Sequence, residues 1–469
     1  MKKIALHNLG CKVNSYEFDI MQQMLQENGY KIVPFDEVAD VYIVNTCTVT
    51  NIADRKSRQM LHRAKTMNPS AIVVAVGCYV QTGGEKALQD ESIDLAIGNN
   101  RKKDLIPILE EFLTERAAHL DGQEKTLHNR TIIDINNTCD YEEMTLKQTA
   151  EHTRAYIKIQ DGCNQFCSYC IIPYARGRVR SRKAEDILRE IRGIVEAGYQ
   201  EVVLTGIHIS SYGIDFQDEA WQRGQSVEAI KEEGRHDYRG KSKLIDLVEQ
   251  IHEIEGLRRI RLGSLEPRVV TAQNAARLAR LKKVCPHFHL SLQSGCNETL
   301  ARMNRHYTAG EYYESVKNLR DVYDHPAITT DVIVGFPGET EREFEETVAF
   351  LEKVGFYEMH IFKYSKRQGT RAAVMKDQIP DQMKALRSNR LLALEKEQSK
   401  NFRSRYIGEK TEVLFEETKE IGGELFWIGH TADYVKVALQ AEENLANSLK
   451  EVRIIEFLTD DILKSNSFD

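Results

Sequence analysis

The first hundred or so residues alternate short apolar runs with longer stretches in which apolar positions recur every three or four residues. The apolar runs predict strands near residues 3–9, 41–46, 72–77 and 94–97. The periodic stretches predict helices near residues 14–28, 51–67, 83–90 and 101–116. Regular alternation of strands and helices is typical of a doubly wound parallel sheet, so we expect an α/β fold for residues 1–116.

A second stretch, residues 151–380, repeats the strand–helix alternation about six times. Its strand-like runs lie at residues 155–160, 201–207, 259–265, 287–293, 328–336 and 358–365. Six parallel units predict a partial βα barrel whose reactive face lies at the carboxyl ends of the strands.

The remaining segments have different patterns. Residues 117–150 are polar and without periodicity, and predict a linker; residues 214–243 are rich in both charge signs, and predict a surface insertion. Residues 381–404 predict one connecting helix. Residues 405–469 change to short strand-like runs, KTEVLFEE, ELFWIGHT, YVKVAL and EVRIIEFL, which predict a small C-terminal β-barrel.

Composition narrows the function classes. The chain has 469 residues, 41% of them hydrophobic, and a formal net charge of −7, so any nucleic-acid partner has to be held by local basic patches. Two such patches are Arg55, Lys56, Arg58, Arg63 and Lys65, and Arg176, Arg178, Arg180, Arg182 and Lys183. No apolar run approaches twenty residues, and the N-terminus reads as a buried strand rather than a signal peptide. We therefore expect a cytoplasmic protein with no membrane contact.

The strongest chemical pattern is Cys163, Cys167 and Cys170, directly after the predicted strand at 155–160. Three thiolates on one loop can hold an iron–sulfur cubane and leave one iron open for chemistry. A structural zinc site would need a fourth ligand nearby, and the sequence offers none before His208. The CxxxCxxC spacing, with Tyr169 before the last cysteine, resembles the radical S-adenosylmethionine superfamily. That resemblance implies that the open iron chelates S-adenosylmethionine and that Tyr169 packs against its adenine.

A second triplet, Cys11, Cys47 and Cys78, is dispersed along the sequence. Each cysteine follows a predicted strand of the first sheet. The carboxyl ends of parallel strands lie at one edge of a sheet, so we expect the three thiols to meet there and to bind a second 4Fe–4S cluster. An ordinary buried role for each cysteine is the alternative. Cys139, Cys285 and Cys296 have no partner spacing, and we predict that they are not ligands.

Polar residues and glycines at the ends of the barrel strands predict a nucleoside pocket. The residues are Thr205, Gly206, Ser291, Gln293 and Gly335. Glycine at a strand end permits a close approach of the backbone to a ligand, although a plain turn explains each one equally well on its own. His208, beside Gly206, is the one histidine that we consider worth testing.

Together the two triplets and the β-barrel tail resemble the methylthiotransferase family over the whole chain. The matching stretches are LGCKVNSYE (9–17), NTCTVT (45–50), GCY (77–79), GCNQFCSYCIIPYARGRVRSR (162–182), SLQSGCNETLARMNRHYT (291–308) and DVIVGFPGETEREFEET (331–347). The resemblance implies an N-terminal methylthiotransferase domain, a radical S-adenosylmethionine domain and a C-terminal TRAM domain. Lys12-Val13 after the first cysteine is similar to the type that acts on N6-threonylcarbamoyladenosine, next to the anticodon of tRNA.

The resemblance also implies a mechanism and partners. One S-adenosylmethionine methylates sulfur carried on the second cluster. Another, cleaved at the Cys163 cluster, yields a 5′-deoxyadenosyl radical that removes hydrogen from C2 of the adenine. An electron donor such as flavodoxin or ferredoxin is required. Arg176, Arg178, Arg180 and Arg182, together with residues 405–460, are expected to hold the tRNA, although a solvated face or a cofactor contact explains the arginines as well.

Other functions remain open at this stage. Sister types in the family act on isopentenyladenosine in tRNA or on an aspartate of a ribosomal protein. In a different class, an iron–sulfur protein that binds RNA or senses redox state without catalysis would have the same β-barrel tail and basic patches. Cleavage of S-adenosylmethionine by the reduced protein separates an enzyme from a sensor.

Overall fold

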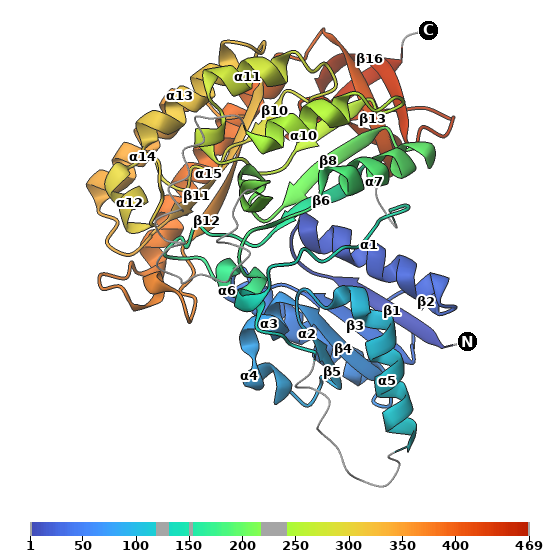
Figure 1. Ribbon diagram of the computed structural model, residues 1–469. Helices are drawn as coiled ribbons and strands as arrows, with labels where there is room; N and C mark the ends of the chain where they lie inside the picture. The colour runs from blue at the N-terminus through green and yellow to red at the C-terminus, as the bar shows by residue number, and fades with distance from the viewer. Residues whose placement is uncertain (1, 119–130, 150–152, 217–241, 468–469) are drawn as a thin grey trace.

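The N-terminal region of the computed structural model is a five-stranded parallel sheet with the order β2-β1-β3-β4-β5 (Figure 1). The structure describes residues 2–118, 131–149, 153–216 and 242–467. The strands are β1 (Lys3–Asn8), β2 (Lys31–Val33), β3 (Val41–Thr46), β4 (Ile72–Gly77) and β5 (Leu95–Ile97). Helices α1 (Lys12–Glu27) and α5 (Leu105–Ala118) pack on one face of the sheet, and α2 (Asn51–Met67) packs on the other. The predicted α/β fold is confirmed for this part of the chain.

Two details of this sheet differ from the sequence prediction. The short edge strand β2 was not predicted, because its three residues are too few for a periodic pattern. The predicted helix at 83–90 is instead two short helices, α3 (Cys78–Gly83) and α4 (Glu85–Leu88). Gly84 lies between them with a φ of +48°, a conformation that interrupts a right-handed helix.

The central region is an open arc of six parallel strands. These are β6 (Ala155–Asp161), β8 (Glu201–Gly206), β9 (Arg259–Leu262), β10 (His287–His289), β11 (Ala327–Val334) and β12 (Glu358–Lys363). Ladders join β6-β8-β9 and β10-β11-β12, and the parallel bridges Ile260–Val284 and Leu265–Leu290 connect the two groups. A two-residue strand, β7 (Arg180–Ser181), adds an antiparallel edge to β6. The arc confirms the predicted partial βα barrel.

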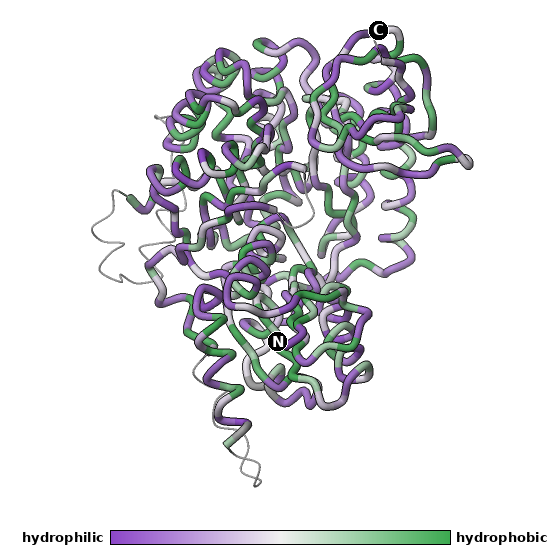
Figure 2. The backbone as a smooth tube through the Cα atoms, turned by 90° about the vertical axis from the view of Figure 1, so that its right-hand side faces the viewer, coloured by the Kyte–Doolittle hydropathy of each residue, from purple (hydrophilic) through white to green (hydrophobic). Residues whose placement is uncertain are grey.

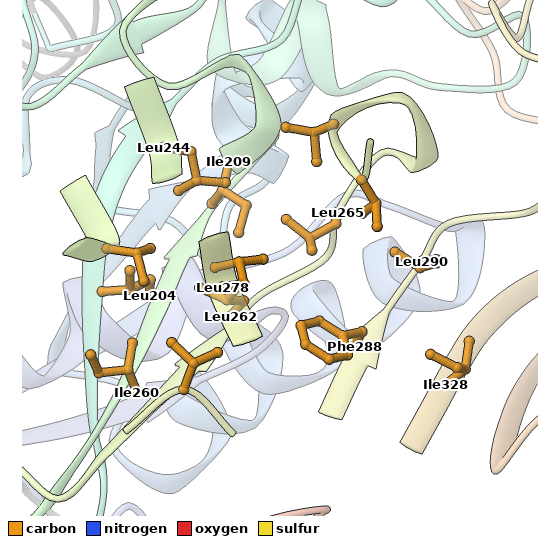
Figure 3. Close-up of a cluster of buried hydrophobic side chains, with 14 of the residues drawn as sticks. Leu204, Ile209, Leu244, Ile260, Leu262, Leu265, Leu278, Phe288, Leu290 and Ile328 are labelled. Atoms are coloured by element: carbon orange, nitrogen blue, oxygen red, sulfur yellow. The ribbon is translucent and has the colours of Figure 1, made fainter. Parts of the chain in front are cut away.

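Amphipathic helices cover the outside of the arc. They are α7 (Ala184–Glu196), α10 (Lys243–His252), α11 (Ala272–Ala279), α13 (Ala309–Arg320), α14 (Glu341–Val354) and α15 (Asp381–Ser404), with the short α6 (Ile172–Arg176) and α12 (Asn297–Arg302) near the strand ends. Hydrophobic and hydrophilic positions alternate along these helices (Figure 2). Their apolar sides meet strand residues such as Leu204, Phe288 and Ile328 in the largest core of the molecule (Figure 3). Burial of this apolar surface is the main force that holds the arc together.

The C-terminal region is a closed β-barrel of five strands in the order β13-β14-β15-β17-β16. The strands are β13 (Lys410–Ile421), β14 (Glu424–Thr431), β15 (Lys436–Leu439), β16 (Ser448–Phe457) and β17 (Ile462–Ser467). The first four were predicted. The last, ILKSNS, has too few apolar positions to read as a strand from sequence and is held by pairing with β15 and β16.

This C-terminal barrel docks on the amino-terminal ends of the arc strands. Arg259 donates to the carbonyl of His430 at 3.0 Å, and Arg261 donates to that of Ala432 at 3.0 Å. The ring of Tyr434 lies beneath Arg154 and Arg261, 4.9 and 4.6 Å from its centroid. The docked barrel therefore closes the end of the arc that is opposite the carboxyl ends of the strands.

The segment predicted as a linker is packed where the structure describes it. Met144 and Leu146 are buried in the main core, and Tyr16 donates to the carbonyl of Met144 at 2.8 Å. Tyr141 donates to the carbonyl of Lys158 at 2.9 Å. Residues 131–149 therefore connect the N-terminal sheet to the arc through packed contacts. The sequence predicted a linker here from polarity alone, which does not reveal these contacts. Residues 119–130 and 150–152, and residues 217–241 of the predicted insertion, lie outside the described residues.

In the described part of the chain, every helix is too short or too polar to cross a bilayer.

Candidate active site

The triplet of Cys163, Cys167 and Cys170 lies on the loop between β6 and α6. At the start of this loop Gly162 has a φ of +72°, and a Cβ at this position would lie 1.7 Å from the carbonyl oxygen of Arg178, so only glycine fits. The backbone N–H of Cys170 donates to the carbonyl of Cys167 at 2.9 Å, which closes a tight turn. The three thiols lie within electrostatic range of one another. The structure thus brings the predicted cluster cysteines together.

Donor groups around this loop can stabilise thiolates that bind a metal, although burial by itself favours neutral thiols. Burial, followed by the neighbouring Cys167, raises the pKa of Cys163 and raises that of Cys170 to about 12. Arg305 opposes this effect, because its guanidinium donates to Cys167 Sγ at 3.2 Å. Thiols are deprotonated when they bind iron, and the thiolates then need a cation and N–H donors around them. Arg305 and the backbone N–H of Gln165, 3.5 Å from Cys163 Sγ, supply these groups, so the site fits a three-thiolate cluster.

Cys11, Cys47 and Cys78 follow the neighbouring strands β1, β3 and β4 and meet at the carboxyl edge of the first sheet. Electrostatic interactions link all three. Gly10 has a φ of +120°, and a Cβ at this position would lie 2.8 Å from Asn14 Nδ2 and 3.2 Å from Cys47 Sγ. Burial raises the pKa of Cys11, and raises that of Cys47 to about 11. This second triplet also has the donor set of an iron–sulfur site.

Arg176 joins the two cysteine regions. It lies at the end of α6, after the first loop, and its Nε donates to Cys78 Sγ of the second triplet at 3.2 Å. Its guanidinium also donates to Asn14 and Glu17 of α1, at 2.6 and 2.5 Å, and lies 3.3 Å from Asp161 of β6. A single buried side chain thus contacts the second triplet, the helix that follows Cys11 and the strand that leads into the first triplet.

Arg176 belongs to a buried network of cations and carboxylates. Lys102, Lys158, Arg176 and Arg180 are buried and pair with Glu17 and Asp161. The buried Glu142 also interacts electrostatically with the two lysines. Burial alone would raise the pKa of Glu17, but Arg176 and the two lysines hold that pKa well below its usual range. The network holds the Arg176 guanidinium in place beside Cys78 Sγ.

Arg176, Arg178, Arg180 and Arg182, which were expected to hold the tRNA, do not form an exposed basic patch. All four side chains are buried, with exposures of 9% for Arg178 and 1% for each of the others. Arg182 pairs with Glu190 and with Glu143, the latter at 3.1 Å. Arg180 donates to the carbonyl of Arg176 at 3.0 Å, and Arg178 lies over the ring of Phe166 at 4.4 Å. Sequence could not reveal this, because the anionic partners come from distant segments.

The other basic patch is partly a surface feature. Arg55, Lys56, Arg58 and Arg63 are exposed on α2, whereas Lys65 is half-buried and paired with Asp94 at 2.5 Å. Helix α2 begins just after Cys47, and its first residue, Asn51, donates to the carbonyl of Lys366 at 2.8 Å. This exposed basic face therefore adjoins both the second triplet and the loop after β12.

The residues predicted for a nucleoside pocket lie at the carboxyl ends of the strands, as their sequence positions require. The space beside the two glycines is filled by protein, however, since a Cβ on Gly206 would meet Gln160 and one on Gly335 would meet Lys384. Glycine is therefore needed at these two positions for packing against protein, which does not support the expected close approach to a ligand.

The predicted polar residues of this pocket have varied surroundings. Thr205 is buried, and Gln293 has a φ of +72° and continues the arc through its backbone pairing with Asp331. The carbonyl of Ser291 accepts from Tyr307, whose hydroxyl also accepts from Arg305 at 3.0 Å. A chain of contacts thus leads from Ser291 to the first cysteine loop.

Tyr169 is half-buried beside the first triplet and packs edge-to-face against Phe336, with 6.5 Å between ring centroids. Sequence reasoning missed Glu266, which is buried after β9. Glu266 lies 3.3 Å from His208 and accepts from the side chain of Gln165 in the cysteine loop at 3.1 Å. Its position in the run GSLEP, at a predicted strand end, could have pointed to it.

Family comparisons agree with this geometry. Residues 157–351 match the family described as the Radical SAM superfamily, and residues 3–98 match the uncharacterized protein family UPF0004. The solved structure of the radical S-adenosylmethionine methyltransferase TsrM from Kitasatospora setae is similar to 77% of this chain and 72% of that chain, with a TM-score of 0.53 and 15% identity. That similarity concerns the fold alone.

Curated relatives extend over nearly the whole chain. The chain is 37% identical over 97% of its length to the Bacillus subtilis threonylcarbamoyladenosine tRNA methylthiotransferase MtaB, of which it covers 94%. It is 36% identical over 88% of its length to the protein of the same name from Aquifex aeolicus, covering 92%. It is 33% identical over 97% of its length to the tRNA-2-methylthio-N(6)-dimethylallyladenosine synthase of Moorella thermoacetica, covering 96%. The chain therefore belongs to the radical S-adenosylmethionine methylthiotransferase family.

Proposed function

We propose that this enzyme adds a methylthio group to C2 of N6-threonylcarbamoyladenosine in tRNA, next to the anticodon. The observation that carries the proposal is the pair of three-thiol sites joined by Arg176. The relatives named for threonylcarbamoyladenosine, at 37% and 36% identity, favour this substrate. A relative at 33% identity is named for dimethylallyladenosine, so the substrate needs a direct test.

Membership of the radical S-adenosylmethionine family implies one 4Fe–4S cluster and S-adenosylmethionine. Cys163, Cys167 and Cys170 would hold this cluster. When bound, the two cofactors supply a radical that removes hydrogen from a carbon without acidity or a leaving group. The chain's own residues position the reaction: Arg305 donates to Cys167, and Ser168 donates to the carbonyl of Met303 at 2.9 Å, which fixes the loop against the strand ends.

The second cluster belongs to the proposal as well. Cys11, Cys47 and Cys78 would hold it, with Arg176 and Asn99 donating to Cys78 Sγ at 3.2 and 3.5 Å. Hydrogen bonds to a ligand thiolate stabilise its charge and tune the cluster. Asn99 also donates to the carbonyl of Ala175 at 2.7 Å, so the donors that serve this site also fix it to the radical domain.

Contacts to S-adenosylmethionine are proposed for Tyr169, Thr205, Gly206, Ser291, Gln293 and Gly335. Tyr169 offers an aromatic ring beside the first cysteine triplet, and the two glycines would contribute backbone groups. An electron donor such as flavodoxin or ferredoxin is also required, since the radical step consumes an electron.

Contacts to tRNA are proposed for the exposed basic face of α2 and for the C-terminal barrel. Arg55, Lys56 and Arg58 are exposed on α2, the helix that follows Cys47. Cations that neutralise phosphates release counterions, so each alanine substitution in α2 should reduce the slope of tRNA affinity against salt by about 1. A truncation near residue 404 that binds tRNA like the full chain across a salt series removes the barrel from the proposal.

Nucleosides from cells test the substrate. Deletion of the gene should remove the 2-methylthio form of threonylcarbamoyladenosine from digested tRNA, and the restored gene should return it, as measured by mass spectrometry. If methylthio-isopentenyladenosine or a ribosomal methylthio-aspartate disappears instead, the family holds and the substrate is wrong.

A further inference from the structure

Three polar side chains gather on one face of the arc, away from both cysteine triplets. His289, Asp331 and His360 come from the neighbouring strands β10, β11 and β12, and their side-chain N and O atoms lie within 4.8 Å of one another. Asp331 is the direct neighbour of His360 in the parallel register. His289 Nε2 lies 3.4 Å from Asp331, and its other ring nitrogen hydrogen-bonds Thr329 at 3.0 Å, which fixes the orientation of the ring.

This face is the inner face of the arc. The alternate residues of the same strands, among them Phe288, Val332 and Met359, are buried against the outer helices. Side chains alternate between the two faces of a strand, so the His–Asp–His cluster points away from the helices. His360 is exposed and Asp331 half-buried, which leaves the cluster open to a ligand.

The cluster lies between the radical site and the floor of the arc. Ile333, two residues after Asp331 on the same face, packs with Tyr169 and Phe336 beside the first cysteine loop. In the other direction His287, two residues before His289, lies 5.3 Å from the ring of Tyr434 in the docked barrel. Each step of two residues along a strand is about 6.5 Å, so the cluster is within one nucleoside length of the radical site.

The opposite side of this space is lined by the residue after the first cysteine of the second triplet. Lys12 begins α1, and its ammonium interacts electrostatically with Arg154 and Arg261 and with His287 on the inner face of the arc. This part of the interior is therefore polar and carries both charge signs, since Glu201 also interacts with Lys12. Asp331 adds a further carboxylate.

We propose that His289, Asp331 and His360 recognise the threonylcarbamoyl substituent of the substrate adenosine. This assignment rests on the proposed function. The imidazoles, with Lys12 opposite, suit the substituent's carboxylate, and Asp331 can accept from its hydroxyl or N–H groups. An isopentenyl group would instead leave these polar side chains desolvated without partners, which disfavours it. The cluster thus determines which modified adenosine reacts.

The test uses the reconstituted full-length enzyme and anticodon stem-loop RNAs. One RNA contains threonylcarbamoyladenosine, and a second contains the analogue in which the carboxylate is a neutral carboxamide. The wild-type enzyme should prefer the carboxylate. His360→Ala should reduce kcat/KM for the carboxylate RNA about 10- to 100-fold, mainly through KM, and the His289→Ala/His360→Ala double variant should reduce it further. For the carboxamide RNA, both variants should show a much smaller reduction in kcat/KM.

Controls separate the possible failures. His325→Asn, on an exposed loop where the residue has a φ of +47° that Asn tolerates, should leave both kinetic constants unchanged. Cleavage of S-adenosylmethionine without RNA, measured for each variant, reports whether the radical site has formed. If the wild type does not act on threonylcarbamoyl RNA, the proposed function fails. If it acts but His360→Ala keeps the same preference, this inference fails. A preference that disappears after dialysis against a chelator that leaves the iron content unchanged overturns it in favour of a bound cation.

Discussion

The two cysteine triplets reach similar donor sets by different routes. Cys163, Cys167 and Cys170 lie on one loop, and the backbone turn from Cys167 to Cys170 already brings them together. Cys11, Cys47 and Cys78 meet only because β1, β3 and β4 are neighbours in a parallel sheet. The first site is thus determined locally, while the second exists only when the sheet is folded.

Their surroundings differ in the same way. Arg305 reaches Cys167 from the segment after α12, and its other close contacts are with the neutral Tyr307. Arg176 at Cys78 belongs to a buried network that includes Glu17, Asp161 and Lys158. The network links two domains, so the second site depends on the domain interface as well as on its own ligands. This difference predicts which substitutions damage chemistry and which damage the fold.

The largest effect is expected at the radical site. Replacement of Cys163, Cys167 and Cys170 by Ala should reduce reductive cleavage of S-adenosylmethionine to background, because no other thiols are placed to hold that cluster. Quantification of 5′-deoxyadenosine by liquid chromatography measures it. Cleavage at the wild-type rate in the triple variant would show that the radical cluster is bound elsewhere.

The second triplet should separate cleavage from product formation. With Cys11, Cys47 and Cys78 replaced by Ala, S-adenosylmethionine should still be cleaved, but the methylthiolated nucleoside should not form, because the sulfur-carrying site is lost. Both products are counted in one reaction with tRNA. A triple variant that still makes the methylthio product would show that these three cysteines do not hold the sulfur-carrying cluster.

Arg176 and Arg305 should differ in their effect on stability. Arg176→Ala removes the buried donors to Glu17 and Asn14, and should lower the free energy of unfolding of the cluster-free protein by about 3–5 kcal/mol. Arg305→Ala leaves the neutral Tyr307 without its donor, and should lower the free energy of unfolding by about 1 kcal/mol. Anaerobic urea denaturation measures both, with Arg189→Ala, an exposed ion pair, as a control expected near zero. Equal losses at Arg176 and Arg305 would contradict the comparison.

A third ionic site lies at the floor of the arc, where Glu201 and Arg261 interact electrostatically with each other and with the buried Cys285. Burial alone would raise the pKa of Glu201, but Arg261 and Arg154 overcome it and lower the pKa to about 2. A lowered carboxyl pKa stabilises the fold above the unfolded value near 4.5, and this contribution is lost as the pH falls toward 2. Glu201→Gln should therefore cost about 3 kcal/mol at neutral pH and flatten the dependence of stability on pH between about 4.5 and 2.

The exposed pair of Glu443 and Lys450 provides the matched control for this experiment. Glu443→Gln should change the free energy of unfolding by less than about 0.5 kcal/mol at both neutral and acidic pH. If Glu201→Gln loses stability below pH 4.5 as steeply as the wild type does, other carboxylates are responsible for the acid sensitivity.

Sequence predicted the elements well and the contacts between distant elements poorly. The strands at 41–46 and 72–77 and the helix at 51–67 have the predicted bounds, because long apolar runs and strong periodicity leave little choice. The meeting of Cys11, Cys47 and Cys78 could be predicted because the edge of a parallel sheet is a topological consequence of alternation. Short elements such as β2 and β17 could not be predicted, because they form strands only through pairing with neighbouring strands.

The arginines illustrate what local sequence cannot supply. The run RGRVRSR predicts a basic surface. Arg176 and Arg182 are nevertheless buried, because each forms an ion pair with a glutamate on another element, Glu17 and Glu190 respectively. Likewise His289, Asp331 and His360 are spaced across more than 70 residues and meet only through the register of β10, β11 and β12. A charge pattern predicts a surface only when its counter-charges are known to be absent.

Iron and sulfide content tests the central claim, two separate three-thiol cluster sites, most directly. After anaerobic reconstitution the wild-type protein should contain about eight irons and eight sulfides per chain, and each triple alanine variant about four of each, since a cubane holds four of each. Circular dichroism confirms that the variants are folded. A folded variant that retains the full iron content, or loses all of it, would contradict the account.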